Sequence, residues 1–431
     1  MSRAVWQKIK KSEFTAVTLL NTMGIVVRLV TALFSAKILA LFVGASGMAY
    51  MGNFRNMLAS LEAFTSFGLA NGIVQYVASH REDKQRIEQF VTTLLRFMLG
   101  ILLVVSVGLF LGREQIDQYL FAGAFSMPKL FICLAFVFPL QVLNGIWIAF
   151  LTGLAQFKKV IYLNIIGNIS GLLLTFYLVY TQGVSGALFA MILSPVILFF
   201  VSLFWVKQML QLKWQPFDFS LIKPLFSYAV MALFSAVVSP LCLLWVRKLL
   251  MHNTGVELAG IWEGIQRISG IYMLFITTLA FTYFLPKLAE AQQYQEKKKV
   301  IRLYLTGVLP LFALGLLLVY FTRSWIIPLV LDASFSPMID FMQWQLVGDF
   351  IKGAALIYGL LFYTERLLWP YLLCETLFFS CFYGLTYLLI GHFGIEAATL
   401  GYTLAYIIYS CVLVVYFSWY FSRSESKHSQ G

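Results

Sequence analysis

Charged residues are scarce in this sequence. Only 12% of its 431 residues are Asp, Glu, Lys or Arg, whereas an ordinary soluble domain carries about 25%. Hydrophobic residues make up 60% of the chain and the mean hydropathy is +0.83, so a soluble fold would lack the polar surface needed to cover itself. This composition excludes a soluble globular protein and predicts a membrane protein.

Sequence signatures of catalysis and of cofactor binding are also missing. The five cysteines have no CxxC spacing, which argues against a zinc site or a disulfide framework. No P-loop, HExxH or GxSxG pattern occurs, so nothing predicts an ATP-driven pump or a hydrolase. No segment between apolar runs exceeds about twenty residues, which is too short for an inserted soluble domain. We therefore expect no enzyme activity, no catalytic residue, no metal, no cofactor and no nucleic-acid partner.

Long apolar runs fill most of the chain, and each is long enough to cross a hydrocarbon core of about 30 Å as a helix. We place twelve spans at residues 14–43, 47–78, 90–112, 128–154, 160–181, 185–206, 223–251, 257–286, 300–322, 338–362, 370–390 and 396–420. The expected fold is an all-α polytopic membrane protein with two six-helix lobes around a central cavity. The lobes are expected at 1–206 and 223–420, with a cytoplasmic linker at 207–222 and a cytoplasmic tail at 421–431.

Basic residues are distributed unevenly between the two sides of this arrangement. With the N-terminus in the cytoplasm, the cytoplasmic segments hold 20 basic residues and the opposite loops hold two, Arg113 and Arg323. Basic residues accumulate on the cytoplasmic side of membrane proteins. The count predicts that both termini are cytoplasmic, and it accounts for most of the net charge of +12.

The two halves carry a weak internal repeat. Residues 47–54 (GMAYMGNF) match residues 255–262 (GVELAGIW) at an offset of 208. Both segments follow the expected turn between the first two helices of a half. Two six-helix repeats are related by an axis along the membrane normal, and this arrangement favours alternating access.

Ionisable residues inside the spans are the most informative part of the sequence, because a charge at bilayer depth requires a partner or water. Nine basic residues lie there: Arg28, Lys37, Arg55, Arg96, Lys129, Arg247, Lys248, Arg267 and Lys352. Away from span ends only four acids accompany them: Glu62, Glu263, Asp349 and Glu375. Spacing allows the pairs Glu263–Arg267 and Asp349–Lys352 on single helix faces. The excess of positive charge predicts an anionic substrate.

The first hairpin places charges at two depths. Around a turn near residue 45, Lys37 and Arg55 lie at one depth, and Arg28 and Glu62 lie together further toward the cytoplasm. Arginine forks and a lysine ammonium suit a phosphate-bearing substrate, and the carboxylates could couple transport to protons. The alternative is that these polar residues only join helices to one another.

Three stretches give the sequence a resemblance to a known family. They are GNFR at 52–55 followed by Asn71-Gly72 and Tyr76-Val77-Ala78, RKLL at 247–250 followed by GIW at 260–262, and WQLVGD at 344–349 with Lys352. These residues resemble the Wzx-type flippases, the O-antigen or lipid III translocases of the multidrug/oligosaccharidyl-lipid/polysaccharide exporter superfamily. The resemblance covers residues 14 to 420. It departs from the family pattern at Arg28, where a lysine is expected.

The resemblance implies a flippase of a bacterial inner membrane. Its substrate would be an undecaprenyl-diphosphate-linked oligosaccharide, an O-antigen or enterobacterial common antigen repeat unit, moved to the periplasmic leaflet with an ion gradient as the energy source. The residues expected to bind the diphosphate are Arg28, Lys37, Arg55, Arg247, Lys248 and Lys352. Those expected to couple protons or ions are Glu62, Glu263, Asp349 and Glu375.

The sugar portion of such a substrate needs amide and aromatic contacts. We expect them from Asn53, Asn71, Gln75, Trp262, Gln266, Trp344 and Gln345, although such residues also serve as interfacial and packing residues. Membrane lipids are further expected partners. A polysaccharide polymerase and a chain-length regulator are partners implied by the resemblance alone.

Two rival functions fit a polytopic membrane protein. A multidrug exporter of the same superfamily that carries organic cations predicts an acidic interior, whereas basic residues exceed acids here. A membrane polymerase of lipid-linked sugars predicts a sizeable extramembrane loop, whereas the longest loops on the periplasmic side, near Arg113–Met127 and Arg323–Pro337, are short. Both rivals are therefore less well supported than a flippase.

Overall fold

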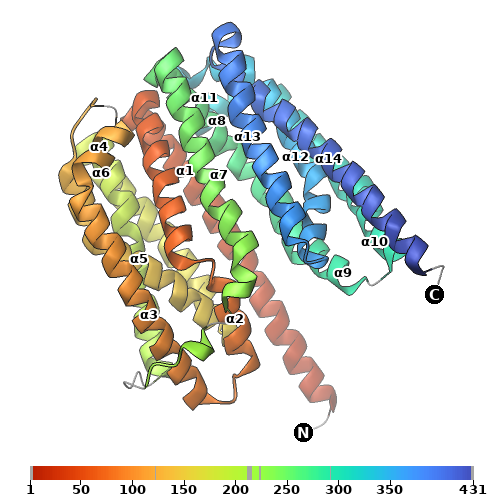
Figure 1. The fold of residues 1–431 in the computed structure, drawn as a ribbon. Coiled ribbons are helices and arrows are strands. Elements are labelled where there is room, and N and C mark those ends of the chain that lie inside the picture. Colours follow the sequence, from red (N-terminus) through yellow and green to blue (C-terminus); the bar gives the residue numbers. More distant parts are fainter. Residues whose placement is uncertain (1–2, 122, 211–215, 223–224, 292, 429–431) are drawn as a thin grey trace. The chain divides into compact units, whose positions relative to one another are not determined.

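The protein is built from helices. The computed structural model describes residues 3–121, 123–210, 216–222, 225–291 and 293–428, and these residues contain no β-strand (Figure 1). Ten of the described helical stretches are long and apolar enough to cross a membrane. The expected all-α polytopic membrane fold is confirmed.

Two of these ten stretches contain a turn at a glycine. Helix α1 (Arg3–Ser66) is interrupted at Gly44, with φ 69° and ψ 179°, and α6 (Phe157–Met209) at Gly183, with φ 57° and ψ −129°. Glycine adopts positive φ without the steric cost that other residues incur. In α6 the two segments fold back on each other. The close approach is seen at Gly186, where a Cβ would lie 1.8 Å from the carbonyl oxygen of Leu178. Counting each half of these two stretches separately, the described residues supply twelve helical segments, roughly consistent with the twelve spans predicted.

The remaining elements, apart from α2 and α4, lie within or close to the predicted spans. They are α2 (Ala70–Ser79), α3 (Lys84–Leu111), α4 (Arg113–Phe121), α5 (Pro128–Gly153), α7 (Leu225–Thr254), α8 (Val256–Leu279), α9 (Leu285–Glu290), α10 (Tyr294–Leu303), α11 (Leu309–Val330), α12 (Met338–Thr364), α13 (Leu368–Phe393) and α14 (Glu396–His428). Short 3₁₀ turns lie at Phe219–Leu221 and Ala333–Phe335.

The predicted span 47–78 is not one continuous helix. The chain leaves helical geometry at Phe67 and Gly68, both with positive φ, and resumes in α2. A run of apolar residues gives the length of a span, but it does not register a local break in backbone hydrogen bonding. In addition, the loop expected after Arg113 contains the short helix α4.

Two spans of the second half contain a widened π-helical turn. The turns are Ala280–Phe284, between α8 and α9, and Tyr304–Val308, between α10 and α11. Each is followed two residues later by a proline, Pro286 or Pro310. Proline has no backbone N–H to donate to the preceding turn, and a π-bulge accommodates the disrupted hydrogen-bond ladder.

The chain forms two compact units. Unit 1 comprises Met1–Val43 and Met57–Val237, and unit 2 comprises Gly44–Asn56 and Val238–Gly431. In unit 1, α5 packs on α2, α3 and α6, and in unit 2, α12 packs on α8, α11 and α14. A short piece of α1 therefore belongs to unit 2. The lobes expected at 1–206 and 223–420 stay a prediction.

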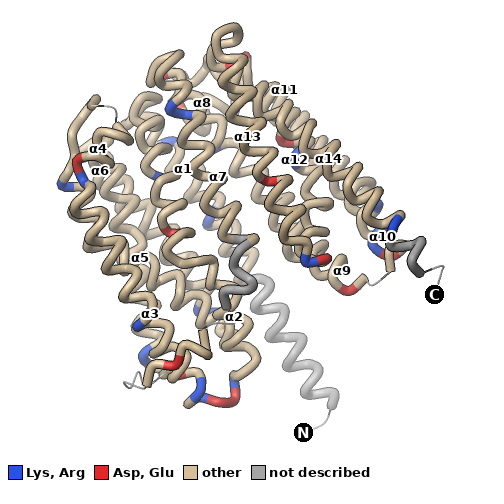
Figure 2. The backbone as a smooth tube through the Cα atoms, viewed as in Figure 1, with Lys and Arg blue, Asp and Glu red and all other residues tan. Residues whose placement is uncertain are grey.

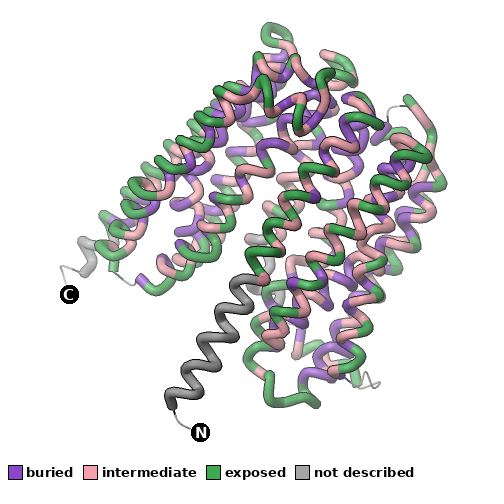
Figure 3. Tube along the Cα trace, turned by 180° about the vertical axis from the view of Figure 1, so that it is seen from behind, coloured by how far each residue is buried: buried purple, intermediate pink, exposed green. Residues whose placement is uncertain are grey.

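The surface of the helices is largely apolar. On α11, for example, Phe321, Trp325 and Leu329 are each at least 75% exposed. Figure 3 shows exposed and buried residues interleaved along the same helices, and Figure 2 shows Lys and Arg gathered near helix ends, such as the α2–α3 connection and the start of α10. Apolar residues exposed over whole helices indicate contact with lipid.

Candidate functional site

Three arginine side chains of unit 2 meet around one carboxylate, that of Glu263. Glu263 Oε1 lies 2.7 Å from Arg55 Nη1 and 3.2 Å from Arg267 Nε. Glu263 Oε2 accepts hydrogen bonds from Arg247 Nη2 at 2.6 Å and from Arg55 Nη2 at 3.3 Å. We call these four residues the Glu263 cluster. It combines three positive charges with one negative charge.

The cluster is assembled by three helices. Arg55 comes from the second segment of α1, Arg247 from α7, and Glu263 and Arg267 from successive turns of α8. Room for it exists because residue 52 is glycine. A Cβ there would lie 2.6 Å from both Arg247 Cζ and Glu263 Oε2, closer than van der Waals contact allows.

The internal repeat explains one of these pairs. Arg55 and Glu263 are 208 residues apart, which equals the offset of the repeat between residues 47–54 and 255–262. Equivalent positions of the two halves therefore carry opposite charges and bind each other. The second close approach is at Gly260, where a Cβ would lie 1.6 Å from the carbonyl oxygen of Ala45.

The three arginines differ in their access to solvent. The side chain of Arg247 is 0% exposed, that of Arg267 is 16% exposed and that of Arg55 is 38% exposed. Arg247 is enclosed further by Asn53, whose Oδ1 accepts a 3.4 Å hydrogen bond, and by the Trp262 ring 5.3 Å away. Within the cluster, Arg55 is the cation best placed to meet a ligand.

A second polar group surrounds Asp349 on α12. Its Oδ2 accepts hydrogen bonds from Tyr272 Oη at 2.5 Å and from Ser269 Oγ at 2.7 Å, and its Oδ1 accepts one from Tyr402 Oη at 2.7 Å. Gln345 Nε2 lies 3.3 Å from both carboxylate oxygens. Asp349 is 0% exposed, and its hydrogen-bond partners are neutral.

Lys352 lies one turn beyond Asp349 on α12. The possible Asp349–Lys352 pair is not among the ion pairs of the described residues, and the Lys352 ammonium instead lies 6.0 and 5.8 Å from the ring centroids of Tyr402 and Tyr406. A cavity of about 140 Å³ adjoins it, lined among others by Ser239, Gln266, Lys352, Phe378 and Tyr406. Unit 2 thus has a small polar cavity with a lysine in its wall.

The sequence profile of the polysaccharide biosynthesis protein family matches residues 38–340, well over half of the chain. The chain belongs to this family.

Curated relatives of this family member include flippases and transporters. The lipid III flippase of Escherichia coli (strain K12) is 28% identical over 404 residues, which cover 93% of this chain and 95% of that protein. A putative O-antigen transporter of Shigella flexneri is 22% identical over 265 residues, covering 58% of this chain and 62% of that protein. The predicted resemblance to Wzx-type flippases is confirmed.

Solved structures place the fold of this family member among multidrug and lipid transporters. An inward-facing multidrug resistance MATE family transporter of the MOP superfamily has a TM-score of 0.78 at 15% identity, covering 93% of this chain and 99% of that one. The lipid II flippase MurJ in its inward closed conformation has a TM-score of 0.69 at 13% identity, covering 94% and 87%. At such identities the likeness concerns the fold alone.

The predicted charged residues of unit 1 are more dispersed than those of unit 2. Arg28 is exposed, while Lys37 and Glu62 are half-buried. Glu62 Oε2 accepts a hydrogen bond from Gln141 Nε2 at 3.1 Å. No Arg28–Glu62 ion pair occurs among the residues that the structure describes. The two residues were expected at the same membrane depth, but they do not pair.

The remaining charged candidates lie in unit 2. Glu375 on α13 accepts a 2.9 Å hydrogen bond from Tyr409 Oη of α14 and is half-buried, as is Lys248 on α7. The tyrosine partners of the acids were not predicted. The sequence does carry a signal for them, because Tyr402, Tyr406 and Tyr409 recur at helical spacing and lie on one face of α14.

The seven predicted sugar-contacting residues differ in their exposure. Asn53, Trp262 and Gln345 are fully buried, Asn71 and Gln75 are exposed on α2, and Trp344 lies at the surface of α12. Gln266 Nε2 donates to Gln345 Oε1 at 3.3 Å. Hydrophobicity patterns locate such residues along a helix, but the neighbouring helices decide which of them stay accessible.

Proposed function

We propose that this chain is a flippase that moves an undecaprenyl-diphosphate-linked oligosaccharide from the cytoplasmic to the periplasmic leaflet by alternating access. The repeat unit would be of the O-antigen or enterobacterial common antigen kind, in keeping with the flippase relatives described above. The observation that carries the proposal is the Glu263 cluster, in which three arginines share one carboxylate. Such an excess of buried positive charge suits an anionic substrate.

Within the cluster we assign different roles to the three arginines. Arg55, the most exposed, would bind a phosphate oxygen pair directly, because a guanidinium fork matches phosphate geometry. Arg267 is partly exposed and would support the binding of phosphate by Arg55. Arg247 has no exposed surface, so it would act by holding Glu263, which in turn orients Arg55.

The other predicted cations would hold the diphosphate at further stages of its path. Arg28, Lys37 and Lys248 are exposed or half-buried, and Lys352 lines the small cavity of unit 2. Lysine suits a moving anion, because its ammonium is a flexible point charge. We propose that these four residues contact the phosphates in turn.

Ion coupling would fall to carboxylates that have neutral partners. Glu62 is bonded to an amide, Glu375 to a tyrosine, and Asp349 to tyrosine, serine and glutamine side chains. Glu62 and Asp349 can take up a proton without leaving an arginine uncompensated, and we assign Glu375 to the same role. Glu263 cannot, since protonation would leave three guanidinium groups facing each other, so we assign it to positioning in place of coupling.

Sugar recognition would rest on the exposed members of the predicted set. Asn71 and Gln75 lie one turn apart on α2 and are exposed, so their amides can hydrogen-bond to sugar hydroxyls. Gln266, half-buried beside the cavity of Lys352, is a third candidate. The buried Asn53, Trp262 and Gln345 would support the fold of the site.

The proposal extends to the cellular setting. The chain is a multi-pass membrane protein, and we propose a bacterial inner membrane with both termini in the cytoplasm. It would act as a transporter without enzyme activity, supplying lipid-linked units to a polysaccharide polymerase and its chain-length regulator.

A flipping assay in proteoliposomes tests the function. Wild-type protein should move a labelled undecaprenyl-diphosphate oligosaccharide, faster with a proton gradient. Since a hydrogen bond to a charged group contributes about 1.5–3 kcal/mol, Arg55→Ala should slow movement about ten- to a hundredfold. Arg55→Lys keeps the positive charge but lacks the guanidinium fork, so its flipping rate should lie between those of wild type and Arg55→Ala.

The matched control is Arg302→Ala, which removes an exposed arginine from α10. It should flip at the wild-type rate. If Arg55→Ala matches the control while wild type is active, the phosphate assignment is wrong. If wild type moves no such lipid but exports an organic cation, the flippase proposal itself fails.

A further inference from the structure

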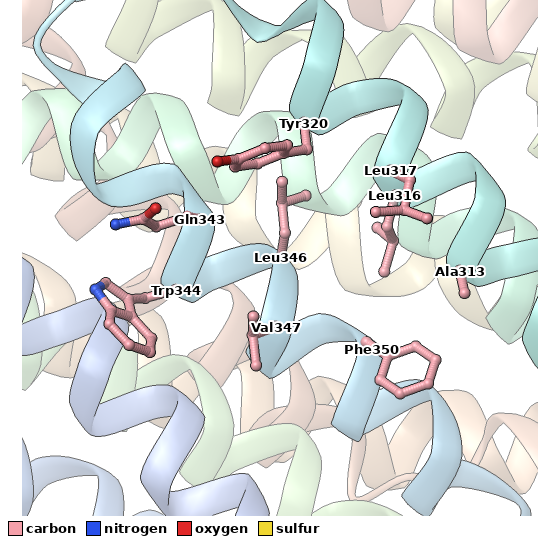
Figure 4. Close-up of a pocket in the computed structure, with 9 residues that line it drawn as sticks. All are labelled: Ala313, Leu316, Leu317, Tyr320, Gln343, Trp344, Leu346, Val347 and Phe350. Carbon is pink, nitrogen blue, oxygen red and sulfur yellow. The ribbon is translucent and has the colours of Figure 1, made fainter.

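A groove separates α11 from α12 on the surface of unit 2 (Figure 4). Its volume is about 560 Å³, and its walls include Ala313, Leu317 and Tyr320 from α11 and Gln343, Val347 and Phe350 from α12. Leu317 is 51% exposed and Val347 45% exposed. Both helices are membrane-spanning candidates, so the groove opens at a depth where hydrocarbon surrounds the protein.

The two ends of the groove differ in polarity. In Figure 4 the Tyr320 hydroxyl points toward the side on which the Gln343 amide and the Trp344 indole lie, whereas Ala313 and Phe350 lie on the opposite side. Nearly all of the groove surface is apolar, and the few hydrogen-bond donors, on Tyr320, Gln343 and Trp344, lie at one end. A lipid has the same order along its length, from polar head to hydrocarbon chain.

Arg323 lies beyond the polar end, one turn after Tyr320 on α11. Its guanidinium carbon is 3.9 Å from the Tyr320 ring centroid, and its Nη1 donates to the Tyr320 carbonyl oxygen. Its Nε has no hydrogen-bond partner, and no carboxylate pairs with it among the described residues. The polar end thus carries a cation for which the described residues supply no counter-ion.

We propose that this groove binds one anionic diacyl phospholipid. Its phosphate would pair with Arg323, its ester carbonyls would accept hydrogen bonds from Tyr320, Gln343 or Trp344, and an acyl chain would lie along Leu317 and Phe350. The hydrogen-bond donors next to the apolar part of the groove favour a phospholipid over an isoprenoid phosphate. A phospholipid has ester carbonyls that can accept these hydrogen bonds, whereas an isoprenoid phosphate has none. With Arg323 on the predicted periplasmic side, the lipid comes from the outer leaflet. The site is independent of the proposed flippase activity.

Native mass spectrometry of the delipidated full chain tests the proposal, with phosphatidylglycerol and phosphatidylcholine of identical acyl chains as probes. Wild type should retain one phosphatidylglycerol at a concentration about tenfold below that needed for phosphatidylcholine, as expected for one charged hydrogen bond. Arg323→Gln should remove this difference. Val347→Trp, which fills the groove, should weaken retention of both lipids, and Leu317→Trp serves the same purpose if that variant does not fold.

Two matched controls are available in the chain. Arg113 stacks on Phe110 and donates to its carbonyl oxygen as Arg323 does on Tyr320, but it also pairs with Glu114. Leu314 is an exposed residue of α11 outside the groove. Arg113→Gln and Leu314→Trp should retain phosphatidylglycerol as wild type does.

Three results would overturn the proposal. Equal retention of both phospholipids by wild type would show that the groove does not recognise the negative charge of the lipid. Wild-type retention by folded Val347→Trp and Leu317→Trp would place the lipid elsewhere. Displacement of phosphatidylglycerol by a lower concentration of undecaprenyl phosphate, lost in Val347→Trp, would make the transported lipid the occupant.

Discussion

At the scale of single residues, Glu263 has the largest consequences for the molecule. Its carboxylate is 0% exposed and neutralises part of the charge of three guanidinium groups, one of them equally enclosed. An ion pair of this kind costs desolvation energy and gives little net stability against an apolar replacement. Removing only one partner is strongly destabilising, because the remaining charges stay buried without compensation.

We expect Glu263→Gln to lower the free energy of unfolding by about 3–5 kcal/mol, the usual consequence of breaking a buried ion pair. The glutamine amide keeps the size of the side chain but leaves the charge of Arg247 uncompensated inside unit 2. Denaturation in detergent micelles, followed by circular dichroism, measures the change.

Glu257→Gln is the matched control, since Glu257 is an exposed glutamate in the first turn of the same helix. It should change stability by less than about 0.5 kcal/mol. Equal stability of the two variants would mean that Glu263 does not balance the arginines.

At the scale of elements, the spans were predictable and their interruptions were not. The length of an apolar run defines a span, and Gly44 and Gly183 fall where turns were expected between spans. The break at Phe67 and the two π-helical turns escaped prediction. Hydropathy measures how apolar a segment is, whereas these features depend on which backbone carbonyl each N–H reaches.

We expect Gly260→Ala to loosen the packing of α8 against the segment of α1 that belongs to unit 2. The new methyl would lie 1.6 Å from the Ala45 carbonyl oxygen, so the backbone must shift at a cost of about 1–3 kcal/mol or more. The melting temperature in detergent and the yield of folded protein should both fall.

Gly270→Ala lies on the same helix and meets no atom within 4 Å, so it should fold as wild type does. A Gly260→Ala protein with the same melting temperature as this control would show that Gly260 does not pack closely against Ala45.

At the scale of the whole molecule, the chain is a polytopic membrane protein whose orientation we predict from its basic residues. The 20-to-2 distribution of these residues between the predicted sides is a strong bias under the positive-inside rule. Helix α10 carries Lys297, Lys298, Lys299 and Arg302, the densest basic segment of the chain. It should therefore face the cytoplasm.

Cysteine labelling in spheroplasts tests this orientation, after replacement of the five native cysteines. Arg113→Cys should react with a membrane-impermeant maleimide in intact spheroplasts, and Arg302→Cys only after permeabilisation. The reverse pattern would invert the topology and place both termini outside.

The site was predictable in part. Composition and depth singled out Arg55, Arg247 and Glu263 as unusual, and helical spacing predicted the contact between Glu263 and Arg267. That the first three meet depends on how α1, α7 and α8 pack, which a single sequence does not specify. The partners of Asp349 were missed for the same reason. Its spacing on α12 suggested Lys352 as a partner, but its carboxylate accepts hydrogen bonds from hydroxyl groups of α8 and α14.

The membership of residues 44–56 in unit 2 has a consequence for biosynthesis. Arg55 is synthesised 208 residues before Glu263, which at about 5–20 residues per second is a delay of about 10–40 s. Throughout that interval its guanidinium lacks the carboxylate that later neutralises it, and a lone cation is costly in hydrocarbon. The first hairpin must therefore wait in a hydrated environment, at the translocation channel or the lipid headgroups. We therefore expect its insertion to be completed late in translation, after α8 emerges from the ribosome.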